Sequence, residues 1–171
     1  MTLSHDGSCR VLGVDPGLNT TGYAIVEQRR GRLELVEAGI VRGTVRGNMG
    51  SRLREIHEGV AEVIAAFQPA ALAIEELYSH YERPQTAILM GHARGVICLA
   101  AAQADLPIHS YAATQVKRML TGNGRAPKTQ VQQAILREFG LREMPEPPDV
   151  ADAMAIALCH HYLARQPLST L

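Results

Sequence analysis

Three β-rich runs with tight connections precede the first helical pattern, and this order constrains the fold more than any other feature of the sequence. Residues 10–15, 21–27 and 33–41 are rich in apolar and β-branched side chains, with turn-forming residues between them. Successive strands joined by such short turns pair in the antiparallel direction, because a parallel pair needs a much longer crossover. The sequence therefore predicts an antiparallel meander of three strands.

Short strands and helices alternate in the rest of the chain. Apolar runs predict strands over residues 70–74 and 107–110. The helices expected from apolar spacing and from Pro and Gly boundaries cover residues 51–67, 84–104, 114–120, 127–139 and 149–164. Ser51 is the expected N-cap of the first helix. The predicted fold class is α/β: a mixed five-stranded sheet (antiparallel meander plus parallel strands) flanked by helices on both faces.

The composition indicates one soluble globular domain. Of the 171 residues, 46% are hydrophobic and 20% are charged. No apolar run approaches the roughly 20 residues that a membrane-spanning helix needs. The three cysteines are far apart, which argues against a disulfide framework and suits a reducing cytoplasm. We expect a flexible extension over residues 1–9, a single domain over 10–164 and a tail over 165–171, in a cytoplasmic protein without membrane association.

The charge of the chain is balanced overall but uneven along its length. The formal net charge is +0, with 17 basic and 17 acidic residues. Between Asp105 and Glu138 there is no acidic residue, whereas the basic residues there are Lys117, Arg118, Arg125, Lys128 and Arg137. A solvated basic face is the simpler interpretation of this segment. A surface that binds nucleic acid is the alternative, favoured if divalent cations neutralise acidic residues elsewhere.

Carboxylates stand at the ends of two predicted strands and at the start of the last predicted helix. Asp15 and the pair Glu75-Glu76 follow apolar strands, and ligand sites in α/β sheets gather at such carboxyl ends. Asp149 and Asp152 are three residues apart, on one face of a first helical turn. A turn former at Asp15 and a helix cap at Asp149 are the simpler interpretations. The residues alone leave the choice between Glu75 and Glu76 open.

A cluster of these carboxylates would require cations. At 4 Å and an effective dielectric constant of ~20, each like-charged pair costs about 4 kcal/mol. Oxygen ligands alone select hard cations such as Mg²⁺ or Mn²⁺. Two such ions about 4 Å apart can clamp the attacking water and the leaving oxygen of a phosphoryl displacement. The spacing of these carboxylates is suggestive of, and not specific for, a metal-dependent phosphoryl displacement, in which Asp15 would be best placed to bridge both ions.

Several motifs, in order along the chain, resemble the RuvC Holliday junction resolvases. They are Val11–Gly17 with Thr21-Gly22-Tyr23, Ala73–Glu75, Gly91-His-Ala-Arg-Gly95, Gln115-Val-Lys117, Gly122-Asn-Gly124 through Lys128, and Asp149–Ile156. Together they span nearly the whole chain. The resemblance implies an RNase H-like fold and a homodimer that acts on four-way DNA junctions alongside a branch-migration helicase, in DNA recombination and repair. It also implies paired symmetric nicks that leave 5′-phosphate and 3′-hydroxyl ends, with two Mg²⁺ ions per active site and Mn²⁺ as a possible substitute.

The resemblance also assigns expected site residues. The catalytic and metal-binding carboxylates fall on Asp15, Glu75, Asp149 and Asp152, so Glu75 is chosen over Glu76. The DNA-binding positions fall on Tyr78, an aromatic residue expected to stack on a base, and on Lys117 and Lys128. Arg118 and Arg125, in the same acid-free segment, are further candidates for DNA binding. A one-residue difference in length after Tyr78 leaves residues 79–85 without an assignment.

Three other functions fit parts of the pattern. Asp15-Pro-Gly17 followed by Thr21-Gly22 resembles the phosphate loop of actin–hexokinase ATPases, but the chain lacks a second such motif and is far shorter than those proteins. A non-catalytic junction-binding module would explain the basic segment and not the carboxylates. An RNase H-like enzyme that cuts RNA–DNA hybrids is the third alternative. The deciding question is whether the four carboxylates converge.

Overall fold

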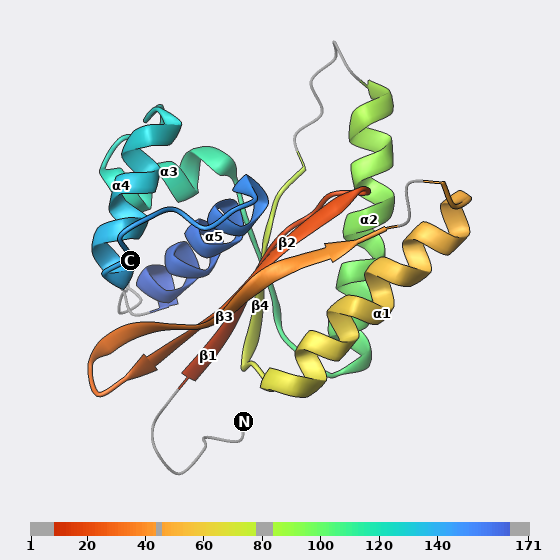
Figure 1. Cartoon of the computed structure of the whole chain (residues 1–171), viewed down its shortest axis with the longest axis horizontal. Helices are drawn as coiled ribbons and strands as arrows, with labels where there is room; N and C mark the ends of the chain where they lie inside the picture. The colour runs from red at the N-terminus through yellow and green to blue at the C-terminus, as the bar shows by residue number, and fades with distance from the viewer. Residues whose placement is uncertain (1–8, 44–45, 78–83, 165–171) are drawn as a thin grey trace, which may run out of the picture.

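The computed structural model describes residues 9–43, 46–77 and 84–164, which form one sheet with helices on both sides (Figure 1). The strands are β1 (Cys9–Asp15), β2 (Thr20–Arg29), β3 (Arg32–Arg42), β4 (Ala71–Glu75) and β5 (Ile108–Tyr111). The helices are α1 (Met49–Phe67), α2 (Pro84–Gln103), α3 (Ala113–Thr121), α4 (Lys128–Phe139) and α5 (Pro148–Ala164). The order and type of these elements confirm the sequence prediction. None of the described helices is long and apolar enough to cross a membrane.

The sheet is mixed, as expected. Its strand order is β3-β2-β1-β4-β5. The pairs β1–β2 and β2–β3 are antiparallel, whereas the pairs β1–β4 and β4–β5 are parallel. The β2–β3 turn consists of Arg30 and Gly31, whose φ angles are 50° and 80°. Two positive φ angles characterise the type I′ turn, whose twist matches that of the flanking strands. The predicted meander is therefore confirmed, and β1 lies at the centre of the sheet.

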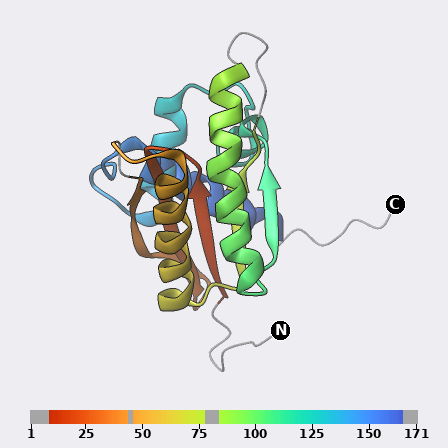
Figure 2. The ribbon, with the colours of Figure 1, turned by 90° about the vertical axis from the view of Figure 1, so that its right-hand side faces the viewer.

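Helices cover each face of the sheet. The helices α1 and α2 run side by side over one face (Figure 2), whereas α3, α4 and α5 lie on the other (Figure 1). Side chains alternate along β1, so Leu12 and Val14 join the core under α1 and α2, while Val11 joins the core under α5. Asp15 is in phase with Val11 and consequently faces the α5 side.

The start of α1 differs from the prediction. The helix begins at Met49, and its N-cap is Asn48 rather than Ser51. The Oδ1 atom of Asn48 accepts a hydrogen bond of 2.9 Å from the Ser51 backbone N–H. Asn is as good an N-cap as Ser, so Asn48, the earlier residue, accepts the hydrogen bond from the free N–H. The helix is therefore two residues longer at its start than the predicted range 51–67.

Two strand glycines allow α5 to lie directly on the sheet. A Cβ atom on Gly13 would lie 2.3 Å from the Ala153 carbonyl oxygen, and one on Gly22 would lie 2.1 Å from the Asp149 carbonyl oxygen. Any side chain at these two positions would push the helix away. The backbones of β1 and β2 therefore set the position of the first turn of α5, which carries two of the predicted site residues.

A buried polar contact joins the other end of α5 to the edge of the sheet. The Nδ1 atom of His160 and the hydroxyl of Tyr111 on β5 are 2.7 Å apart. Burial, with smaller contributions from His109 and His161, lowers the pKa of His160 to about 4. The ring is therefore neutral at physiological pH, and it packs as a structural element rather than as a charged group.

Candidate active site

Asp15 and Glu75 leave the sheet side by side. The strands β1 and β4 are parallel, with Val14 opposite Ile74, so the two acids are the next residues at the same edge. Both side chains face α5, and the charge of Glu75 acts on Asp15. Glu76, on the alternate side of the strand, is exposed. Of the two adjacent glutamates, Glu75 is therefore the one beside Asp15.

The first turn of α5 adds two more carboxylates. Gly22 is the antiparallel partner of Asp15 on β2, and the Asp149 backbone lies against Gly22. This contact brings Asp149 to the same end of the sheet as Asp15. Asp152 follows three residues later on the same helix and is partly exposed. Carboxylates from β1, β4 and α5 are thus brought into one region, although they are up to 137 residues apart in sequence.

The electrostatics of Asp15 show that these four groups act on one another. Burial is the largest of the effects that together raise the pKa of Asp15 to about 8; the charges of Glu75, Asp152 and Asp149 contribute to the rise, in that order. Burial and the charge of Asp152 also raise the pKa of Glu75. Such raised values mean that both desolvation and repulsion oppose negative charge at this place in the folded chain. A bound cation would relieve both.

Two lysines face the carboxylates. The Nζ atom of Lys128, the first residue of α4, lies 3.2 Å from Oδ2 of Asp152. Its charge also acts on Asp15, where it opposes the rise in pKa. Lys117 on α3 acts in the same sense on Glu75. The acid-free segment therefore contributes positive charge at the edge of the acidic region.

The donor set fits a hard divalent cation, but it is not closed around one point. Within the described ranges, no three Asp, Glu, His or Cys side chains are gathered tightly enough to form a metal site. The Nζ atom of Lys128 donates a hydrogen bond to the Asp152 carboxylate. The shared electrostatics place all four acids in one neighbourhood, so side-chain rotation is what would close them around an ion. Carboxylate oxygens are the ligands that Mg²⁺ and Mn²⁺ select.

Comparison with known proteins identifies the family. The family model described as "Crossover junction endodeoxyribonuclease RuvC" matches residues 11–160. The chain belongs to the RuvC family. A RuvC from Rhodopirellula baltica is 56% identical over 161 residues, covering 94% of this chain and 90% of the relative. A second, from Caldicellulosiruptor saccharolyticus, is 42% identical over 152 residues, covering 88% and 91%.

Solved structures of RuvC share the fold. Thermus thermophilus RuvC in complex with a Holliday junction substrate superposes with a TM-score of 0.84 at 35% identity, covering 92% of this chain and 95% of that one. The yeast mitochondrial Holliday junction resolvase Ydc2 has a TM-score of 0.62 at 15% identity, covering 88% and 77%, and this likeness concerns the fold alone. The expected RNase H-like fold is confirmed.

The remaining residues predicted to bind DNA in this RuvC family member differ in their exposure. Arg118 on α3 and Arg125 in the following turn are exposed, whereas Lys117 is half-buried. The Asn123 side chain accepts a hydrogen bond of 2.9 Å from the Arg125 backbone N–H, which orders the turn before α4. Tyr78 lies outside the described residues.

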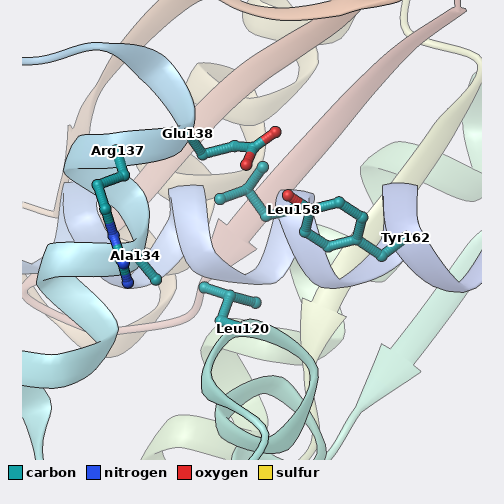
Figure 3. Close-up of a pocket in the computed structure, with 6 residues that line it drawn as sticks. All are labelled: Leu120, Ala134, Arg137, Glu138, Leu158 and Tyr162. Carbon is teal, nitrogen blue, oxygen red and sulfur yellow. The ribbon is translucent and has the colours of Figure 1, made fainter.

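A surface pocket lies elsewhere on the molecule. It is formed between α3, α4 and the later turns of α5 (Figure 3). Its lining residues are Leu120, Ala134, Arg137, Glu138, Leu158 and Tyr162. None of the four carboxylates contributes to it, so the acidic region and this pocket are separate features.

Sequence analysis missed one determinant of the site, namely the close packing of α5 on Gly13 and Gly22. A signal for it was present, because glycine in a strand interior often marks a close backbone approach. Gly22 was noted only as part of a motif. What it contacts lies 127 residues further along the chain, and no local pattern reveals that distance.

Proposed function

We propose that this protein is a structure-selective DNA endonuclease that resolves Holliday junctions by paired symmetric nicks. One observation carries the proposal: carboxylates from two adjacent strand ends and the start of one helix lie in one region of the fold, where the charges of the other three act on Asp15. Family membership supports the same activity, since its relatives are named crossover junction endodeoxyribonucleases. The reaction is hydrolysis of a phosphodiester in each of two strands, leaving 5′-phosphate and 3′-hydroxyl ends, in recombination and repair of DNA in the cytoplasm.

Asp15, Glu75, Asp149 and Asp152 are the proposed ligands of two Mg²⁺ ions, for which Mn²⁺ can substitute. Bound there, the ions would supply an activated water and stabilise charge on the leaving oxygen. Asp15 ends the central strand and the charges of the other three act on it, so it is the residue proposed to bind both ions. Lys128 and Lys117 hold phosphates beside the reacting group, with Arg118 and Arg125 further out. Tyr78 is proposed to stack on a base next to the cut.

The direct test offers the purified chain a labelled four-way junction, an RNA–DNA hybrid and a linear duplex in competition, with Mg²⁺ or Mn²⁺. We expect the junction to be nicked at symmetric positions, with products that DNA ligase can seal. Preferential cutting of the hybrid would instead indicate an RNase H-like enzyme. Junction binding without cutting under every metal condition would indicate a binding module, and tight ATP binding would revive the ATPase interpretation.

A homodimer is proposed because two equivalent cuts need two equivalent active sites. The helix α2 carries large apolar side chains in solvent: Ile88, Leu89 and Leu99 are 60%, 40% and 50% exposed. Gly95, on the same helix, has no atom within 4 Å of the position a Cβ would occupy. An open apolar surface of this kind marks a protein interface. A branch-migration helicase is the further partner proposed from the family resemblance.

Gly95→Glu should dissociate the dimer without harming the fold. The chain itself has space for the side chain, and Glu is a better helix former than Gly by up to about 1 kcal/mol. A charge buried between two apolar surfaces, however, opposes association. Light scattering should show half the mass of the parent, and junction products should change from paired to single nicks. Gln133→Glu, which adds the same charge to the exposed side of α4, is the control and should stay dimeric. An unchanged mass for Gly95→Glu would place the interface elsewhere.

Lys128→Gln should weaken junction binding through the loss of one phosphate contact. We expect the dissociation constant to rise roughly threefold to tenfold at about 0.1 M salt, and the slope of log affinity against log salt to fall by about 1. Fluorescence anisotropy with Ca²⁺ in place of Mg²⁺ measures both. Arg137→Gln removes a positive charge from the other end of the same helix and should change neither. Equal effects of the two substitutions would show a general charge effect instead.

A further inference from the structure

Arg94 connects α2 to two strand ends beside the candidate active site. Its Nε atom donates a hydrogen bond of 3.1 Å to the Glu75 backbone carbonyl, and an Nη atom donates one of 2.7 Å to the Ser110 hydroxyl on β5. Arg94 lies within the Gly91–Gly95 motif, to which the sequence alone assigned no role. The planar guanidinium has several donors in fixed directions, so one side chain can hold two partners at once.

The Glu75 carbonyl is at a point where the sheet offers few backbone donors. Glu75 is the last residue of β4, and β1 continues from Asp15 into Pro16, which has no N–H to donate. On the β5 side, the Glu76 N–H still bonds the Tyr111 carbonyl at 2.9 Å. Arg94 therefore donates a hydrogen bond to the Glu75 carbonyl at the point where β1 no longer provides a backbone N–H.

Arg94 acts on Glu75 from the opposite side of the sheet to the carboxylates. The helix α2 packs on the face that contains Leu72 and Ile74, whereas the Glu75 side chain points to the α5 face. The guanidinium touches the main chain of Glu75 at its carbonyl, and its other bond is to Ser110. Its influence on the Glu75 carboxylate is consequently through the backbone.

We propose that Arg94 is a positioning residue that holds the end of β4 so that the Glu75 carboxylate can meet a divalent cation together with Asp15. This inference rests on the proposed function of Glu75. It also gives α2 two roles, because the helix that carries the exposed apolar surface also fixes one metal ligand. A displacement of α2 would move the carbonyl that Arg94 holds.

The test measures metal binding and catalysis separately in the full-length dimer. Arg94→Met removes both hydrogen bonds, Arg94→Lys keeps the charge without the planar fork, and Ser110→Ala removes only the β5 anchor. Mn²⁺ binding is measured without DNA by titration calorimetry. The catalytic constant and KM are measured on a four-way junction, and junction affinity is measured in Ca²⁺.

For Arg94→Met we expect the Mn²⁺ dissociation constant to rise about tenfold and the catalytic constant to fall about 10- to 100-fold, as for other residues that orient metal ligands. KM and junction affinity should stay close to wild type, and excess Mn²⁺ should restore most of the activity. Arg94→Lys should be intermediate and Ser110→Ala milder. Arg137→Met, an arginine bonded only within its own helix turn among the described contacts, is the control.

Unchanged Mn²⁺ affinity in Arg94→Met would overturn the inference, as would a loss of activity that excess Mn²⁺ does not restore. If Arg94→Met fails to fold, Arg94→Lys and Ser110→Ala decide the matter by the same two measurements. A failure of the proposed function looks different: the unsubstituted dimer would then neither bind Mn²⁺ at this site nor cut the junction.

Discussion

Asp15→Asn should abolish junction cleavage and leave junction binding intact. Asn keeps the size of the side chain but removes the charge that is proposed to bridge both cations, so we expect a loss of cleavage rate of at least about 10³-fold. Basic residues, which this change leaves in place, dominate the affinity for DNA. Cleavage is measured under single-turnover conditions and binding by anisotropy in Ca²⁺. Glu76→Gln, at an exposed acid beside Glu75, is the matched control and should cut normally.

The same substitution should change how stability depends on pH. Burial and the neighbouring acids raise the pKa of Asp15 from 3.8 to about 8 in the folded chain, so between these values the folded state holds a proton that the unfolded state has released. The stability that this proton represents is complete below pH ~4 and is lost as the pH rises toward ~8. In the presence of a chelator, the melting temperature of the wild type should fall across this range, and that of Asp15→Asn should fall less. If the melting temperatures of the two proteins fell equally with pH, the pKa of Asp15 would not be raised in the folded chain.

Substitution of Gly22 by alanine should damage both the fold and the active site. The new Cβ atom would lie 2.1 Å from the Asp149 carbonyl oxygen and 2.4 Å from its carbon, and both are backbone atoms that cannot rotate away. The first turn of α5 must therefore move, and with it Asp149 and Asp152. We expect a loss of about 3 kcal/mol in the free energy of unfolding, at the upper end of overpacking effects. Displacement of the helix carboxylates by about 1 Å should cost cleavage a further factor of about 10².

Chemical denaturation and single-turnover cleavage, measured on the same preparations, check both effects. Gly50→Ala is the control, because its Cβ would meet only the Asn48 side chain, at 3.4 Å. At that helical position alanine should stabilise by up to about 1 kcal/mol and leave cleavage unchanged. A Gly22→Ala protein with wild-type cleavage would mean that the position of α5 is not what places its aspartates.

The sequence predicts most of the fold because its local signals agree with one another. The three strands of the meander, the two later strands and all five helices follow from apolar spacing and turn residues. The exception, the start of α1, arises because Asn48 and Ser51 are both good caps and only the three-dimensional contact chooses between them.

The sequence proposes the members of the candidate site but does not predict the contacts among them. Asp15, Glu75, Asp149 and Asp152 were identified from their places at strand ends and at a helix start, together with the family resemblance. The Lys128–Asp152 ion pair and the anchoring of Glu75 by Arg94 join α4 to α5 and α2 to β4. Such pairs depend on how helices pack across a sheet, and their sequence separation carries no periodic signal.

The two faces of the sheet differ in what evolution or protein engineering can alter. The core under α1 and α2 includes Leu12, Val14 and Ile97 and holds none of the four acids, so its packing can be revised for heat tolerance with little effect on cutting. On the opposite face, α5 packs directly on the backbone at Gly13 and Gly22, and it carries two of the four acids. On this face, the stability of the fold and the cleavage rate depend on the same contact. A substitution that weakens the packing of α5 should therefore lower the cleavage rate even where the protein stays folded.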